Sequence, residues 1–150
     1  MDDAPILICY DGTEGSNRAI EAAAALLGPR RAVVLDIGPP LTAAESVATI
    51  SMIPGQAFED LNTADALNRA RIGAARAELA GFTAEARSAL SAPTWEGIVD
   101  VADEIDAAVI VLGSRGLSGV RERFTGSVSH QVAEHAARPV LIVPPANGPQ

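Results

Sequence analysis

The chain has 150 residues, which suits one domain with a substantial core. Hydrophobic residues make up 48% of the chain and aromatic residues only 3%, which favours a helix-and-sheet fold over an aromatic-rich β-barrel. The net charge of −8 argues against a surface for nucleic acid or anionic membrane, because both need a basic footprint. All eleven basic side chains are arginine, so phosphate chemistry that requires a lysine is excluded.

The N-terminal stretch carries no recognisable targeting segment. It begins Met-Asp-Asp, and its first apolar run covers only residues 6–10. A signal peptide has a positive start and a longer apolar stretch, and a membrane span needs about 20 residues. We therefore expect a cytoplasmic protein that does not enter membranes. Cys9 lies within this first run, where we expect a small buried strand residue and not a reactive thiol.

Apolar runs and amphipathic stretches alternate along the chain, and each predicts a strand or a helix. In chain order we predict a strand at 6–10, a helix from a cap at Thr13 or Ser16 to Leu27, a strand at 32–37 and a long connection at 38–60 that contains about one helical turn. There follow a helix at 60–80, a weakly patterned strand at 83–90, a helix at 93–105, a strand at 108–112, a helix at 127–137 and a strand at 139–144.

This alternation predicts the fold class. Continuous apolar strands separated by amphipathic helices are typical of a parallel sheet that is covered on both faces. We predict α/β architecture: a single doubly wound domain over residues 1–150, Rossmann-like, with a five-stranded, mainly parallel sheet and helices on both faces. Residues 146–150 are expected to form a flexible tail.

A glycine- and arginine-rich segment, GSRGLSGVRERFTGSVS, spans residues 113–129 directly after a predicted strand and leads into a helix. In doubly wound sheets, ligands bind outside the carboxyl ends of the strands, and helix N-termini hold phosphates through free N–H groups. Gly113 and Gly116 would let backbone N–H groups approach an anion. The alternative is a surface loop in which the glycines only permit turns and Ser127 only caps the helix; the position between strand and helix favours phosphate binding.

Several standard phosphate-binding classes are excluded. Without lysine there is no GxxxxGK[ST] segment, so the chain is not a P-loop nucleotidase. No GxGxxG follows the first strand, which disfavours a conventional dinucleotide fold. A phospho-accepting receiver domain also needs a lysine near its last strand. Asp11 remains informative, since it follows the first strand: it can form an Asx turn before Gly12 and can also accept hydrogen bonds from ribose hydroxyls.

The pattern Gly113-x2-Gly116-x9-Gly126-Ser127 resembles the G-2x-G-9x-G-(S/T) signature of ATP-binding universal stress proteins. The similarity covers almost the whole chain, including ILICYDGTEGSNRAIEAA at the start and GSVSHQVAEHAARPVLIVP near the end. It implies an adenine-nucleotide alpha hydrolase-like fold in which Asp11 holds the ribose and the backbone at Ile37 borders the adenine. The residues implied to surround the phosphates are Gly113, Arg115, Gly116, Gly126, Ser127, Val128 and Ser129.

The resemblance implies a cytoplasmic regulatory protein of the stress response that binds ATP, with Mg²⁺ as a candidate companion, and forms a homodimer through its last strand. A regulatory protein partner is expected but not identified. No catalytic residue and no protein-held metal are predicted, so the protein is not expected to be an enzyme. The alternative is an enzyme of the related adenine-nucleotide-binding class, a slow ATPase or an adenylyl transferase, although YDGTEGS lacks the paired glycines typical of adenylyl-transferring relatives.

Histidine and tryptophan residues suggest no further site. His130 and His135 are five apart, a spacing that does not place two ligands on one helical face, so no metal pair is predicted. His135 is expected at a helix end, where a positive charge is favourable. Trp95 is expected to be a packing residue near the start of a helix.

Overall fold

The computed structural model describes residues 3–38, 55–91, 93–114 and 128–146 of the chain. Its elements are β1 (Ile6–Cys9), α1 (Glu14–Leu27), β2 (Arg31–Gly38), α3 (Gly55–Leu79), β3 (Thr83–Leu90), α4 (Thr94–Glu104), β4 (Ile110–Gly113), α5 (Val128–His135) and β5 (Val140–Val143). Each of them matches a predicted element. The largest difference is in α3, which begins at Gly55 instead of residue 60, inside the stretch expected to be a connection.

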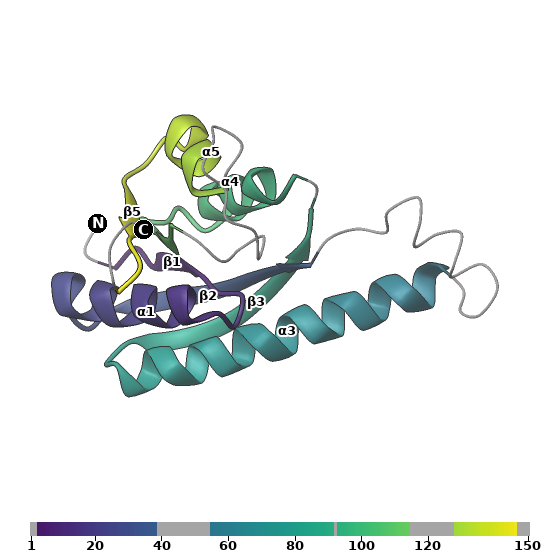
Figure 1. Ribbon diagram of the computed structural model, residues 1–150, viewed down its shortest axis with the longest axis horizontal. Coiled ribbons are helices and arrows are strands. Elements are labelled where there is room, and N and C mark those ends of the chain that lie inside the picture. Colours follow the sequence, from purple (N-terminus) through teal and green to yellow (C-terminus); the bar gives the residue numbers. More distant parts are fainter. Residues whose placement is uncertain (1–2, 39–54, 92, 115–127, 147–150) are drawn as a thin grey trace.

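The strands form one five-stranded sheet in the order β3-β2-β1-β4-β5, and every neighbouring pair is parallel. The doubly wound α/β prediction is therefore confirmed, with a sheet that is parallel throughout. β5 lies at one edge, as expected, and β3 lies at the other. Helices α1 and α3 lie on one side of the sheet and α4 and α5 on the other (Figure 1).

The sheet separates two apolar cores because successive strand residues point to opposite faces. In β1, Ile6 and Ile8 pack into the core that includes residues of α1 and α3, whereas Leu7 and Cys9 pack into the core that includes residues of α4 and α5. Both faces of β1 are buried, which explains why its sequence is a continuous apolar run rather than an alternating one.

Local signals place the chain at the carboxyl end of β1. Thr13 is the N-cap of α1, and its hydroxyl oxygen accepts a hydrogen bond from the backbone N–H of Ser16 at 3.3 Å. The helix ends at Gly28, whose φ of 70° suits a residue without a side chain. The turn between β1 and α1 is therefore held by its own side chains, and it carries Asp11.

Candidate functional site

The strand order reverses beside β1, at the sheet edge where the strands end. The chain passes from β1 to β2 and β3 on one side and later returns to β4 and β5 on the other. Ile8 of β1 lies level with Val111 of β4. Asp11, three residues beyond Ile8, and Gly113, two residues beyond Val111, therefore lie at the same carboxyl edge. This switch point is where doubly wound sheets bind ligands.

Among the described residues, only one of the two carboxylate oxygens of Asp11 has a hydrogen-bond partner. Oδ1 accepts hydrogen bonds from the backbone N–H of Thr13 at 3.0 Å and from the Thr13 hydroxyl at 2.5 Å, which confirms the Asx-type turn. Oδ2 is buried and has no hydrogen-bond partner among the described residues. Because buried polar atoms are almost always paired, a free carboxylate oxygen at this edge indicates an acceptor available to a ligand.

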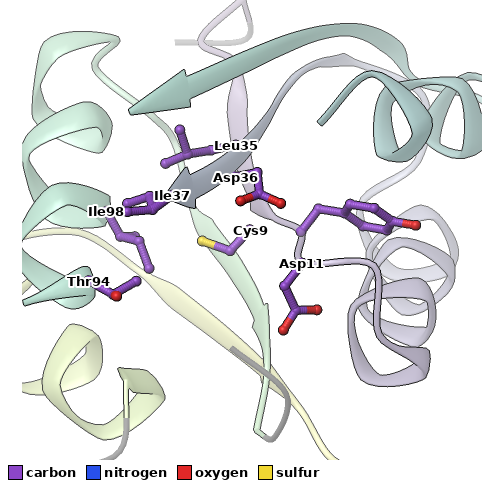
Figure 2. Close-up of a pocket in the computed structure, with 8 residues that line it drawn as sticks. Cys9, Asp11, Leu35, Asp36, Ile37, Thr94 and Ile98 are labelled. Carbon is purple, nitrogen blue, oxygen red and sulfur yellow. The ribbon is translucent and has the colours of Figure 1, made fainter. Parts of the chain in front are cut away.

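A small pocket, partly open to solvent, lies beside Asp11. Figure 2 shows Ile37 and Ile98 on one wall and Asp11 on the other. The residues that line it come from β1, β2, α4 and the β1–α1 turn, and they are Cys9, Tyr10, Asp11, Leu35, Asp36, Ile37, Thr94 and Ile98. Apolar walls with a few polar groups are typical of small-molecule sites.

Helix α4 approaches the pocket closely because it carries a glycine at the contact. A Cβ atom on Gly97 would lie 2.9 Å from Cδ1 of Ile37 and 2.6 Å from Cβ of Ser91. Both distances are too short for a real side chain, so a larger residue would displace its neighbours. Gly97 thus lets Ile37 lie against α4 and helps set the shape of the wall.

Sequence reasoning missed the ion pair beside the pocket. Asp36 of β2 is buried, and Arg69 of α3 binds it with two hydrogen bonds: Nε to Oδ2 at 2.7 Å and a terminal nitrogen to Oδ1 at 3.2 Å. Burial raises the pKa of Asp36, the hydrogen bond and charge of Arg69 lower it, and Asp11 raises it further. A charged residue within the apolar run at 32–37 was the available signal.

Cys9 is buried, as expected, and is not a nucleophile. Burial, and secondarily the charge of Asp11, raise the pKa of its thiol to about 12, so the reactive thiolate is strongly disfavoured. Among the described residues, no group of three histidine, cysteine or acidic side chains is placed to hold a metal ion.

The predicted site residues divide into three groups. Asp11 and Ile37 line the same pocket. Gly113 ends β4, and Val128 and Ser129 begin α5, but these three do not line that pocket. Arg115, Gly116, Gly126 and Ser127 fall outside the described residues. The structure therefore brings together the two residues expected at the ribose and adenine and leaves the predicted phosphate loop undescribed.

The remaining candidates have structural partners. Trp95 stacks on His135, with ring centroids 4.3 Å apart and an interplanar angle of 24°, which joins α4 to α5. His135 ends α5 as expected, and its Nδ1 is hydrogen-bonded to the carbonyl oxygen of Gln131 at 2.9 Å. Within the described ranges, no helix has the length and apolar character needed to cross a membrane.

Comparison with known proteins places this architecture in a family. The sequence model of the universal stress protein family matches residues 4–144. The chain is similar to the universal stress protein YxiE of Bacillus subtilis, at 31% identity over 92% of this chain and 97% of that one. It is also similar to a universal stress protein solved in complex with cAMP, with a TM-score of 0.64 and 28% identity over 95% and 98% of the two chains.

A third similarity is to the universal stress protein of Archaeoglobus fulgidus solved in complex with dAMP. The TM-score is 0.62 and the identity 22%, over 95% of this chain and 99% of that one, which supports the fold alone. The family model spans the fold and both residues of the pocket predicted to touch a ligand. The chain belongs to the universal stress protein family.

Proposed function

We propose that this protein binds ATP at the carboxyl edge of the sheet and acts as a nucleotide-dependent regulator. The observation that carries the proposal is the buried Oδ2 of Asp11, which has no hydrogen-bond partner among the described residues, in a residue that lines a pocket with largely apolar walls. A carboxylate oxygen without an internal donor suits a ribose hydroxyl, and an apolar slot beside Ile37 suits a flat base. A structural relative that is 28% identical was solved with the adenine nucleotide cAMP.

In this proposal, different residues contact the ribose, the adenine and the phosphates of ATP. Asp11 accepts from the ribose, and the backbone at Ile37 borders the adenine. Gly113 and the start of α5 lie at the strand end and helix N-terminus where backbone N–H groups favour phosphate. The other phosphate contacts come from the sequence motif, at Arg115, Gly116, Gly126 and Ser127. Any Mg²⁺ would arrive with the triphosphate, which supplies it with oxygen ligands.

The proposed role is binding and not turnover. None of the described residues that line the pocket is a histidine or a lysine that could serve as a general base. The rival proposal, a slow ATPase or an adenylyl-transferring enzyme, predicts hydrolysis or adenylylation by highly purified protein, whereas binding alone predicts neither. We further propose a cytoplasmic homodimer that pairs through β5 and a regulatory protein partner. β5 supports the dimer because it is a short, apolar strand at the sheet edge, where exposed backbone tends to be covered.

The test is a cycle of two ligands and two proteins. Titration calorimetry would compare ATP with 2′,3′-dideoxy-ATP, which lacks both ribose hydroxyls, on the parent and on Asp11→Asn. Loss of a hydrogen bond to a charged group costs about 1.5–3 kcal/mol, so either change alone is expected to weaken binding roughly tenfold to one-hundredfold. Both changes together are expected to cost little more than one, because they remove the same contact.

Asp100→Asn is the matched control, since it removes the same charge from an exposed position on α4. It is expected to leave ATP affinity unchanged. Equal affinity of the parent for ATP and the dideoxy ligand would contradict the ribose assignment. No measurable binding of either ligand by the folded parent would remove the proposed function itself.

A further inference from the structure

The Arg69–Asp36 pair lies against the pocket but is not part of the ATP-binding motif. Asp36 has a side chain only 4% exposed, whereas that of Arg69 is 42% exposed. The guanidinium uses two nitrogens on the two oxygens of one carboxylate, a bidentate geometry that fixes its position. The charge of Asp36 is therefore compensated by a partly exposed arginine of helix α3.

A second close contact, between Gly73 of α3 and Tyr10, helps to fix the position of the helix for this ion pair. Gly73, one turn after Arg69, packs on Tyr10, and a Cβ there would lie 2.6 Å from Tyr10 Cγ and 2.9 Å from a methyl of Val34. Residues four apart share a helix face, so the same face of α3 meets Tyr10 and β2 at Gly73 and meets β2 again at Arg69. Tyr10 immediately precedes Asp11, which links this packing to the pocket.

Without Arg69 the pocket would be a poor site for an anion. Of the described residues that line it, only Asp11 and Asp36 carry carboxylates, and both lie near the carboxyl ends of neighbouring strands. The pKa of Asp36 is already raised by burial and by the charge of Asp11, so the two carboxylates oppose each other. Two uncompensated negative charges would repel a phosphorylated ligand in a partly buried site, where screening is weak.

We propose that Arg69 sets the charge selectivity of the pocket: by neutralising Asp36, it lets the site accept phosphorylated nucleosides and not only uncharged ones. This inference rests on the proposed function, because it concerns which adenine ligands bind. Arg69 acts through Asp36 and the local field, and it is a positioning and charge-compensating residue. If the pair served only to stabilise the fold, its contribution to the free energy of unfolding would be small, because buried pairs often contribute no more stability than apolar residues of similar volume.

The proposal is tested by comparing ATP with adenosine, which has the same base and ribose but no phosphate. In Arg69→Met, calorimetry should show ATP binding weakened about tenfold or more, equivalent to 1.4 kcal/mol per factor of ten. Adenosine affinity should stay within about twofold of the parent, because no charge repels it. The ratio of the two affinities is a readout that a structural role would not change.

Two further variants protect the test against unfolding and against general charge effects. Asp36→Asn combined with Arg69→Met removes both charges and should return ATP affinity to within about threefold of the parent. Arg76→Met removes an equal charge from an exposed position further along α3 and should leave both ligands unaffected. Circular dichroism confirms that each variant is folded before titration.

The outcomes distinguish a failure of the inference about Arg69 from a failure of the proposed ATP binding. If Arg69→Met weakens ATP and adenosine equally, or leaves ATP binding unchanged, Arg69 does not set charge selectivity and the inference is wrong. Failure of the double variant to recover ATP binding also overturns it. If the folded parent binds neither ATP nor adenosine, the proposed function fails and the inference falls with it.

Discussion

Two arginine–carboxylate groups lie at opposite ends of the strands of the sheet. In one group the carboxylate is the buried partner, and in the other it is the arginine. At the carboxyl edge the carboxylate of Asp36 is buried and its arginine is partly exposed. At the amino edge Arg138 has a side chain only 16% exposed, and its partners Asp103 and Asp106 are 54% and 95% exposed. Arg138 also donates to the carbonyl oxygen of Ala107, which joins the end of α4 to the start of β5.

The comparison shows that burial, and not ion pairing as such, distinguishes a candidate site from a structural tie. A buried carboxylate loses its hydration, so its pKa rises and its charge depends on the neighbouring cation. Exposed carboxylates such as Asp103 and Asp106 keep their hydration whatever Arg138 does. We therefore expect the two edges to respond differently to substitution and to pH.

The largest effect is expected from Arg69→Met. Removing one partner of a buried pair typically destabilises a protein by about 3 kcal/mol or more. Arg69 is the group that lowers the pKa of Asp36, so its removal raises that pKa further. A carboxyl group whose pKa is raised on folding supports stability while protonated, and this support is lost as pH rises through the folded pKa.

Urea denaturation would test this expectation at several pH values. The difference in unfolding free energy between the parent and Arg69→Met should be small near pH 4 and grow toward pH 8. A difference that does not vary with pH would mean that the charge state of Asp36 is not involved. The Asp36→Asn and Arg69→Met double variant should show no such pH dependence.

Arg138→Met is expected to have a smaller and simpler effect. It removes a buried hydrogen bond from a charged donor to a backbone carbonyl, which is worth about 2 kcal/mol. The two carboxylates left behind are exposed and stay hydrated, so we expect the loss to change little between pH 5 and pH 8. If the loss of unfolding free energy depended on pH as steeply as it does in Arg69→Met, the expected difference between the two arginine–carboxylate groups would be wrong.

Cys9 tests whether the carboxyl edge disfavours any additional negative charge. Its thiol pKa rises to about 12 from an ordinary value of 9.0, because of burial first and Asp11 second. Stability from this group is fully present below pH 9 and is lost progressively as pH rises from 9 toward 12.

The measurement is the pH dependence of unfolding between pH 8 and pH 10 for the parent and for Cys9→Ala. The substitution also leaves a small cavity, but that cost is the same at each pH, so the difference in slope isolates the thiol. A thiol reagent should label the native parent at pH 8 far more slowly than the unfolded chain. Equal slopes together with rapid native labelling would show that Cys9 is accessible.

The smallest effect is expected at an exposed pair. Arg87 of β3 donates to Glu104 of α4 at 2.6 Å and lowers the pKa of that carboxyl, but the Glu104 side chain is 64% exposed. Solvent screening makes such pairs weak. Glu104→Gln should therefore leave the denaturation midpoint unchanged within experimental error, and a clear loss would show that pairing matters at this sheet regardless of burial.

Most of the fold could be predicted because its signals are local. The apolar runs mark the buried strands, and Thr13 and Gly28 mark the ends of α1. The start of α3 was missed, since residues 55–60 have no cap or apolar period that distinguishes them from a connection. Asp11 and Gly113 could be placed at one edge, because parallel strands end on the same side.

The sequence by itself therefore determined the order of elements, the parallel sheet and the position of Asp11 at the strand ends. Tertiary structure alone decided that Arg69 meets Asp36, 33 residues away, and that Gly97 lets Ile37 lie against α4. These contacts depend on how helices pack across the sheet, which no short-range pattern specifies. Burial of Asp36, and with it the charge of the pocket, follows from that packing.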